Sequence, residues 1–335
     1  MIFMVKKIIT VVLSILVGVF FMWLATRGLD FKEIQNYFAN ANYFWVALAA
    51  VFGLLAYWFR AVRWNIMFEP MGYRSSVSNS FWSISFGYLM NLTIPRSGEL
   101  ARATALYKVE KIPVENSFGT IVLERIIDLL CMMLFLILTF VLKSDAIQAF
   151  WQQAQSGSQN GTSSSLGYGI AGIGLLGTIL FFSLRKKLEK NAFFAKIYKI
   201  VDGLLDGLLS IFKLRKPGVF IFHSLMIWVC YYLAAYLVCF ALPETAHFSI
   251  ADGFFLIVVG TFGMMVPASG GIGAFHFALK IGVGALFLSM GKSFEEGAQV
   301  GLAYAFISHT MQLVIMLVMG LISIPMLAKA KKGEA

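Results

Sequence analysis

The chain has 335 residues, of which 59% are hydrophobic and 13% are charged, with a formal net charge of +10. A soluble domain carries about 25% charged residues, so this composition excludes an ordinary soluble protein. Several apolar runs exceed the ~18 residues needed to cross a bilayer, which predicts an all-α polytopic integral membrane protein. The positive charge is interpreted as the positive-inside bias of such a protein rather than as nucleic-acid binding.

Six apolar segments are predicted to cross the membrane fully, at 8–25, 43–66, 118–142, 166–184, 218–242 and 297–327. The first resembles a signal peptide, but it is longer than the apolar region of one and no cleavage site follows it. We therefore expect a retained helix. Two further apolar stretches are interrupted, 77–107 at Pro95 and 249–290 at the sequence PASGG.

Loop charge decides how the interrupted stretches run. If 77–94 crossed fully, the basic residues that follow it would lie outside, whereas a re-entrant hairpin over 77–107 returns them to the cytoplasm. A second re-entrant hairpin over 249–290, entered from outside, places every basic cluster inside, including Arg60, Arg63 and Arg74. The polar loop 143–165 is then external, and both termini are expected in the cytoplasm of a bacterial-type inner (plasma) membrane.

The two hairpins divide a single transmembrane domain, 1–335, into repeat units of opposite orientation, 43–142 and 218–327. Each unit consists of a crossing, a hairpin and a crossing, and Pro-x-Ser-Gly occurs at both breaks. Paired broken segments in inverted halves point to a transporter site near the midplane. Chance recurrence of the tetrapeptide in a glycine-rich chain is the alternative.

Between the units, the segment 185–217 combines basic flanks with a helical amphipathic pattern. This pattern is typical of an interfacial helix that binds the anionic cytoplasmic leaflet. A soluble helix packed on the bundle is the alternative.

Three ionisable residues, Glu124, Arg125 and Asp128, occur inside an otherwise apolar predicted crossing. A charge at the centre of a membrane helix costs about 2.5–3.5 kcal/mol, so insertion requires that these charges are paired or wet. Arg125 is three residues from Asp128 and can pair with it, and the remaining carboxylate is expected to pair with Arg96 or Arg102. Such a group is either a structural network or a functional site.

The two breaks supply groups suited to an anion. Ser97 is a plausible N-cap for a helix that contains Glu99, and a helix N-terminus beside Arg96 and Arg102 suits a phosphate. In the second break, the glycines allow positive φ and would direct free N–H groups toward the first break. These glycines are Gly270, Gly271 and Gly273.

The histidines are predicted mainly to have structural roles. His276 follows the second break and is either structural or a proton carrier, whereas His223 and His309 lie on apolar faces and are expected to be structural. The three cysteines lie within apolar runs and have no disulfide or metal-site spacing, so neither a metal nor a cofactor is expected.

Three segments together resemble the lysylphosphatidylglycerol synthase transmembrane (flippase-like) family: NLTIPRSGELARATAL, SFGTIVLERIIDLL and PASGGIGAFHFAL. Full-length members join such a domain to a soluble domain that transfers lysine from tRNA to phosphatidylglycerol, and the membrane part moves the product between leaflets. The resemblance and the residue patterns give one expected substrate-binding set: Arg96, Ser97, Gly98, Glu99, Arg102, Glu124, Arg125, Asp128, Ser269, Gly270, Gly271, Gly273 and His276.

Two departures from the family bear on function. The chain contains no counterpart of the soluble synthase domain and no catalytic motif, so lysyl transfer by this chain alone is not expected. His276 stands where many relatives carry Glu, which puts a cationic lipid in question.

The expected function is translocation of a phospholipid or a lipid-linked headgroup through a polar midplane cavity. One alternative is a lipid-modifying system in which Glu124 and Asp128 act as acid and base. Another is a non-transporting partner that docks a cytoplasmic enzyme through 185–217. The oligomeric state stays open, a homodimer included.

Overall fold

The computed structural model describes residues 2–28, 31–94, 96–156, 191, 195 and 214–333. The chain divides into two compact units, Met1–Phe150 with Leu214–Ala335, and Trp151–Lys213. Every regular element within the described ranges is a helix, which confirms the all-α class. The predicted crossing 166–184 and nearly all of the predicted interfacial segment 185–217 lie outside the described residues.

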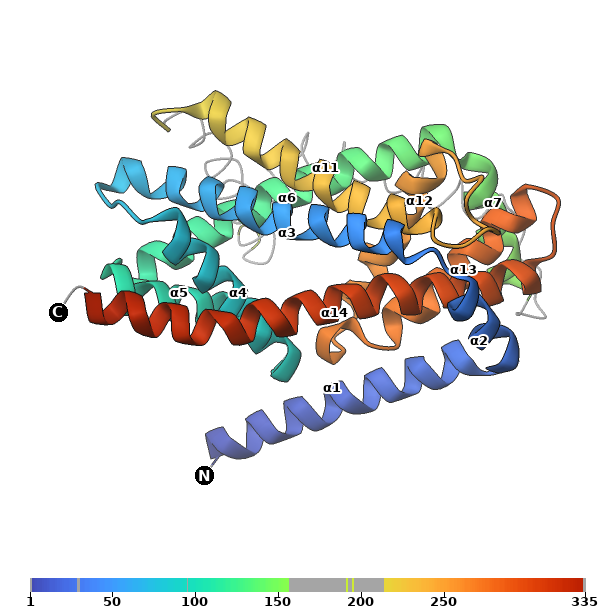
Figure 1. The fold of residues 1–335 in the computed structure, drawn as a ribbon, viewed down its shortest axis with the longest axis horizontal. Coiled ribbons are helices and arrows are strands. Elements are labelled where there is room, and N and C mark those ends of the chain that lie inside the picture. Colours follow the sequence, from blue (N-terminus) through green and yellow to red (C-terminus); the bar gives the residue numbers. More distant parts are fainter. Residues whose placement is uncertain are drawn as a thin grey trace. The chain divides into compact units, whose positions relative to one another are not determined.

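Five long helices form the frame of the larger unit (Figure 1). Four of the predicted crossings, 43–66, 118–142, 218–242 and 297–327, coincide with helices that are long and apolar enough to span a membrane. Together with the helical content, this confirms a polytopic membrane protein. The five helices of the frame are α1 (Ile2–Thr26), α3 (Tyr43–Phe68), α6 (Val114–Leu142), α11 (Pro217–Cys239) and α14 (Phe294–Gly333).

Shorter helices join this frame. They are α2 (Phe31–Asn40), η1 (Glu69–Met71), α4 (Val77–Thr93), α5 (Gly98–Glu110), α7 (Ser144–Ser156), α12 (Ile250–Met265), η3 (Ser269–Gly271) and α13 (Ala274–Ser289). The polar stretch predicted as a loop from 143 is therefore helical at its start. The reason is amphipathicity, because Ala146 and Ala149 are buried and Ala146 joins the main hydrophobic core.

The first interrupted stretch forms an antiparallel pair of helices, α4 and α5. At the tip, Asn91 Oδ1 accepts a hydrogen bond from Gly98 N at 2.7 Å. At the far end, Glu110 Oε1 accepts from Asn79 Nδ2 at 2.8 Å. With 17 and 13 residues, these helices reach about 25 and 20 Å, less than the ~30 Å of bilayer hydrocarbon.

The second interrupted stretch forms a matching antiparallel pair, α12 and α13. A Cβ on Gly263 would lie 2.9 Å from Ala278 Cβ near the tip, and one on Gly282 would lie 2.8 Å from Val259 further along the pair. Each helix has 16 residues, about 24 Å. The length and composition of Ser269–Ser289 also suffice for a span, so the re-entrant membrane course of both pairs stays a prediction.

The two halves pack in a matched way. α3 and α11 run antiparallel, with ring centroids 5.0 Å apart for Trp45 and Phe240 and 5.7 Å apart for Phe59 and His223. α14 packs on α4 as α6 packs on α12, and α13 packs on α14 as α5 packs on α6. In this comparison α3, α4, α5 and α6 of 43–142 correspond to α11, α12, α13 and α14 of 218–327. Each of these contacts in one half therefore has a counterpart in the other.

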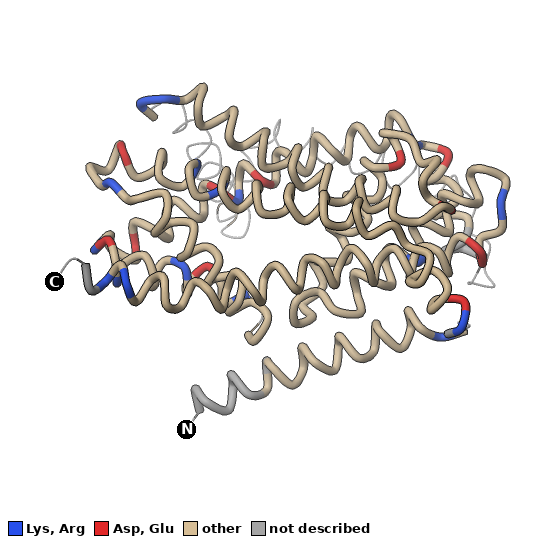
Figure 2. The backbone as a smooth tube through the Cα atoms, in the orientation of Figure 1, with Lys and Arg blue, Asp and Glu red and all other residues tan. Residues whose placement is uncertain are grey.

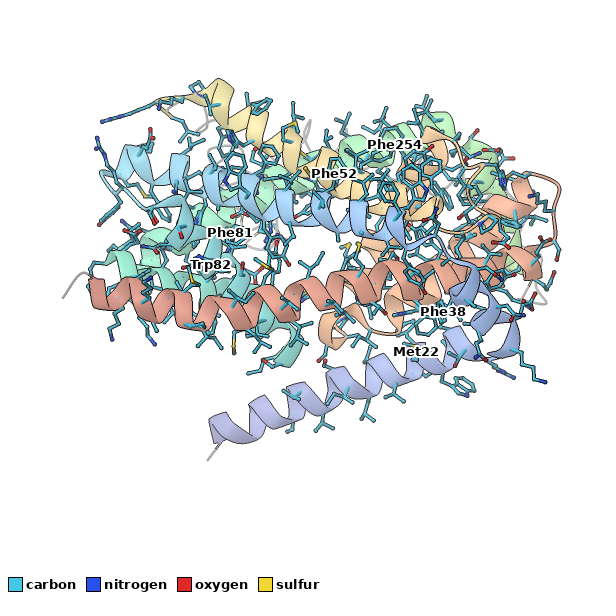
Figure 3. All side chains as sticks on the ribbon, viewed as in Figure 1. Met22, Phe38, Phe52, Phe81, Trp82 and Phe254 are labelled. Atoms are coloured by element: carbon cyan, nitrogen blue, oxygen red, sulfur yellow. The ribbon has the colours of Figure 1, made fainter. Side chains whose placement is uncertain are left out.

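Charged residues gather at the two ends of the long helices, apart from one group inside the bundle (Figure 2). The N-terminus of α1 and the C-terminus of α14 lie at the same end (Figure 1). At the opposite end, Ala25 of α1, Ile34 of α2 and Leu302 of α14 form a small hydrophobic cluster. Phe38 of α2 packs against this cluster (Figure 3).

Candidate functional site

The charged group inside the bundle is centred on Glu124 of α6, whose side chain is fully buried. Its Oε2 accepts a hydrogen bond from Arg102 Nη2 of α5 at 2.8 Å. Its Oε1 lies 3.0 Å from Arg60 Nε and from Arg63 Nη2 of α3, at ion-pair distance without hydrogen-bond alignment. Glu124 therefore ties three helices together, and the three cations compensate the cost of burying its charge.

Asp128 lies one turn further along α6 and extends this network. Arg60 Nη2 and Arg63 Nη1 donate to its two oxygens at 2.8 and 3.0 Å. Arg125 Nη1 lies 3.4 Å from Oδ2, the i,i+3 pairing that the spacing predicts. Asp128 is 13% exposed, so it connects the buried network to an accessible surface.

Arg60 and Arg63 were predicted only to lie toward the cytoplasmic side, which stays a prediction, and their part in this network was not predicted. They are buried, because α3 continues for two turns beyond Arg60 and carries both side chains into the bundle. The available signal was their position at the end of the crossing 43–66, in a chain with unpaired carboxylates in another crossing. The loop-charge argument used them only to orient this crossing and missed them as partners.

Arg125 is exposed to 47% and donates from Nη2 to Glu99 Oε1 of α5 at 2.8 Å. Arg96 and Arg102 of the first break were both expected as possible partners of a carboxylate. Arg102 is the one that pairs, with Glu124 as described above. Arg96 instead donates to Met265 O of α12 at 3.5 Å, so it contacts the second hairpin. Its φ of 60° lies in the left-handed region, which is strained for a residue with a side chain.

The first break is capped differently from the prediction. Ser97 occupies the N-cap position of α5, but its hydroxyl donates to Met90 O at 3.0 Å and Ile94 O at 2.8 Å, at the end of α4. Asn91 accepts the N–H of Gly98 instead. A side chain from the preceding helix therefore takes one of the free N–H groups expected for an anion.

The second break has the backbone expected of its glycines, with φ of 60°, 76° and 83° at Gly270, Gly271 and Gly273. The expectation of free N–H groups facing the first break does not hold at two of them. Gly271 N donates to Ala268 O at 3.0 Å, and Gly273 N lies 3.4 Å from His276 Nδ1. His309 Nε2 lies 2.9 Å from Gly270 O. Both histidines thus hold the break in shape.

Helix α1 packs directly on the second break. Ser14 Oγ lies 2.7 Å from Ser269 Oγ. A Cβ on Gly273 would collide with the backbone of Gly18, so the absent side chain permits this approach. Lys280 Nζ donates to Ala25 O at 2.9 Å at the end of α1. These contacts explain why the break needs small residues.

A cavity of about 690 Å³ lies where the two breaks meet. Its wall includes six of the expected site residues: Arg96, Glu99, Arg125, Asp128, Gly270 and Gly271. The other seven lie off that wall: Ser97, Gly98, Arg102, Glu124, Ser269, Gly273 and His276. Assignment of either set to substrate binding stays a prediction, but the geometry separates residues that support the site from those that face it.

The cavity wall also includes residues that the sequence did not single out. Arg60 is one, and its Nη1 donates to Tyr88 OH at 2.7 Å. Tyr57 packs against Tyr88, with ring centroids 4.6 Å apart and the ring planes tilted by 33°. The rest of the wall is largely apolar and rich in methionine, including Met132, Met264, Met265, Met311 and Met316.

The ionic group has more cations than anions. Among the residues that the structure describes, five arginines and three carboxylates belong to it or border it, an excess of about two positive charges: Arg60, Arg63, Arg96, Arg102 and Arg125, against Glu99, Glu124 and Asp128. In a low-dielectric surrounding, an excess of this kind favours an anionic ligand.

A separate ion pair lies at the other end of the bundle. Lys143, which follows α6, lies 2.9 Å from Asp252 Oδ1 of α12, and Asp252 is almost fully buried. Burial alone would lower the pKa of Lys143, but the hydrogen bond and charge of Asp252 outweigh it and raise that pKa above its usual value. This pair links the end of α6 to the start of the second hairpin.

These features define a polytopic helical membrane protein with an ionic cavity between two helical hairpins. Residues 11–320 match the family described as the lysylphosphatidylglycerol synthase TM region, and the chain belongs to this family. The resemblance inferred from the three motifs is thereby confirmed.

Two relatives give the family context. The chain is 24% identical over 307 residues to Glycosyltransferase AglD of Haloferax volcanii, over 83% of this chain and 49% of the relative. It is 32% identical over 108 residues to a UPF0104 membrane protein of Methanocaldococcus jannaschii, over 31% of this chain and 32% of the relative. The chain thus aligns with half or less of the length of each of these relatives. No solved structure matches it.

Proposed function

We propose that this chain translocates a phospholipid or a lipid-linked headgroup between leaflets. The single observation that carries the proposal is the cavity at the junction of the two hairpin breaks, with Arg96 and Arg125 on its wall. Binding sites at paired broken helices are a feature of transporters built from inverted repeats. The matched packing of 43–142 and 218–327 supports such a repeat.

The composition of the wall suits a lipid. Its arginines suit a phosphate, and its apolar, methionine-rich part suits acyl chains. We further propose that the end bearing both termini is cytoplasmic in a bacterial-type inner membrane. Basic residues that flank the helix ends there support this orientation: Arg74, Lys108, Lys111, Arg215, Lys216, Lys329 and Lys331.

Reconstitution tests the proposal. In proteoliposomes with a headgroup-labelled phosphatidylglycerol, the wild type should move the label between leaflets, and Arg125→Ala should abolish this movement. Lys108→Ala is the matched control, because Lys108 is an exposed cation remote from the cavity wall. Unchanged transport in a folded Arg125→Ala protein contradicts the site assignment, and absence of transport by the wild type contradicts the function.

A second proposal has support from the Haloferax relative, which carries the name glycosyltransferase. In this alternative, the chain is the membrane part of a lipid-modifying system. Full burial of Glu124 among three arginines argues against its acting as a proton donor or acceptor. Mass spectrometry of lipids from a deletion strain discriminates, because only the modifying system predicts the loss of a chemically altered lipid.

A further inference from the structure

The charged residues of the cavity wall belong to the first half of the chain. They are Arg60, Arg96, Glu99, Arg125 and Asp128, from α3, the first break, α5 and α6. The wall residues that the described part of α11 to α14 contributes carry no charge. A lipid is divided in the same way, because its phosphate needs cations and its hydrocarbon chains need apolar surface.

Helix α11 measures how far the cavity extends from its ionic end. At that end, Ser224 Oγ lies 3.5 Å from Arg63 Nη1, which also pairs with Asp128. Further along α11, Ala235 lines the cavity, and its carbonyl oxygen accepts a hydrogen bond from Tyr304 OH at 2.7 Å. The rise of the helix from Ser224 to Ala235 is about 16 Å. The cavity therefore continues well beyond the groups that suit a phosphate.

The apolar part of the wall is within reach of a ligand. Met132, Ala235 and Met316 line the cavity and are half-buried, whereas other wall residues, such as Leu279, are buried. Apolar surface left open inside a cavity is stabilised by contact with hydrocarbon. Methionine side chains also adapt to a ligand of variable shape. This part of the wall therefore suits a hydrocarbon chain.

The cavity is larger than a phosphate-bearing headgroup. At about 30 Å³ for a group the size of water, the roughly ten non-hydrogen atoms of a glycerophosphate fill less than half of the 690 Å³. The remaining volume holds about a dozen further atoms of that size. This is enough for part of one hydrocarbon chain and too little for two.

The cavity opens sideways between α6 and α12. Leu129 of α6 and Met265 of α12 line it and are 56% and 62% exposed, and Arg125 lies beside them on the wall. In contrast, the described wall residues of α3, α11 and α14 are buried or half-buried. Because α6 is long enough to span a membrane and Leu129 lies near its middle, this mouth faces lipid. A chain can enter through it directly from the bilayer.

From these observations we propose that the apolar part of the cavity binds one hydrocarbon chain of the translocated lipid, so that this chain enters the bundle together with the phosphate. The phosphate lies against Arg96 and Arg125, and the chain runs along α11 toward Ala235. The alternative is that the headgroup alone enters the protein and both chains stay in the bilayer. This inference rests on the proposed function and adds a second subsite to its binding site.

Photo-crosslinking in lipid nanodiscs tests where the chain lies. The purified full-length protein is combined with phosphatidylglycerol that carries a diazirine halfway along one acyl chain, and mass spectrometry identifies the crosslinked residues. Crosslinks should occur on the cavity wall at Met132 and Ala235. Val229 of α11 and Leu134 of α6 are exposed and lie off the wall, so they report chains in the bilayer. Crosslinks confined to such outer positions overturn the inference.

Two variants that fill the subsite sharpen the test. Ala235→Trp and Met132→Trp should each lower crosslinking to the wall about 10-fold, as the exclusion of one or two methylenes implies. Val229→Trp is the matched control, because it adds the same ring to the outer face of α11. Thermal unfolding identifies which variants fold, and the less crowded Met132 provides the second measurement if Ala235→Trp does not. Unchanged crosslinking in a folded variant overturns the inference.

The two proposals fail in different ways. If Arg125→Ala abolishes transport while the diazirine reacts only at outer positions, the proposed function stands and the chain subsite falls. If the diazirine reacts on the wall but the wild type moves no lipid between leaflets, the subsite stands and the proposed function falls. If neither crosslinking on the wall nor transport occurs, both fall.

Discussion

Glu124 and Arg125 are neighbours in the sequence, but Glu124 is fully buried among three arginines whereas Arg125 is 47% exposed on the cavity wall. Successive residues of a helix point about 100° apart, so one turn of α6 serves both the bundle and the cavity. The difference predicts distinct consequences for substitutions at the buried and exposed positions.

Glu124→Gln should destabilise the fold strongly. The substitution leaves Arg60, Arg63 and Arg102 with one carboxylate fewer in a buried environment, and breaking such a pair costs about 3–5 kcal/mol. Thermal unfolding in detergent measures the effect. Glu115→Gln, at an exposed position of the same helix, serves as the control and should change stability little. Equal unfolding temperatures for the two variants would contradict the structural role of Glu124.

Arg96→Gly should separate stability from transport. Glycine adopts the left-handed φ of 60° without strain, so the variant should be as stable as the wild type or more stable by up to about 1 kcal/mol. Loss of the guanidinium should slow transport at least several-fold. Lys111→Gly relieves a similar φ of 55° at the end of α5 and should leave transport unchanged. Equal transport rates in both variants would remove Arg96 from the site.

Gly273→Ala should release α1 from the second break. The added Cβ meets a φ of 83° and collides with the backbone of Gly18, whereas Gly72→Ala meets a φ of 82° with nothing within 4 Å. The comparison isolates the collision from the backbone strain. Disulfide formation between Ser14→Cys and Ser269→Cys reports the contact, and its yield should fall with Gly273→Ala alone. Similar yields with either alanine would mean that α1 does not depend on this approach.

Lys143→Met should destabilise the protein in a pH-dependent manner. The wild-type pKa of Lys143 is raised in the folded state, so its contribution is fully present below its unfolded pKa of about 10.4 and is lost as pH rises through the folded value. Unfolding temperatures should therefore differ by a constant amount between about pH 6 and 9 and converge at higher pH.

Asp145→Asn is the control for this ion pair. Asp145 is 55% exposed and 3.4 Å from Lys143 Nζ, so its removal should cost at most about 1 kcal/mol. A loss as large as that of Lys143→Met would show that the buried partner Asp252 is not the source of the stabilisation.

Much of the architecture follows from local sequence. Four predicted crossings coincide with membrane-length helices, and both interrupted stretches become antiparallel helical pairs with the break where proline and glycine occur. The reason is that apolar length, helix interruption and positive φ depend on residues close together in the chain. The same local patterns carried the family resemblance.

The partners of the buried charges could not be obtained in this way. Arg60 was used only to orient its crossing, yet it contacts Asp128, 68 residues away. The Ser97 hydroxyl makes no cap hydrogen bond to α5, whereas Asn91 of the preceding helix accepts the N–H of Gly98. Loop-charge rules count residues along the chain and do not say which face of a helix meets which neighbour. Which side chain accepts the free N–H groups at the start of a helix likewise depends on how the adjoining helix packs.

The sequence by itself determined that this is a helical membrane protein of a particular family, because hydrophobicity and short motifs are local properties. The tertiary structure alone decided which charges hold the bundle together and which face the cavity. That division depends on how α3, α5 and α6 pack, since an ion pair forms only where distant residues are brought within about 3 Å.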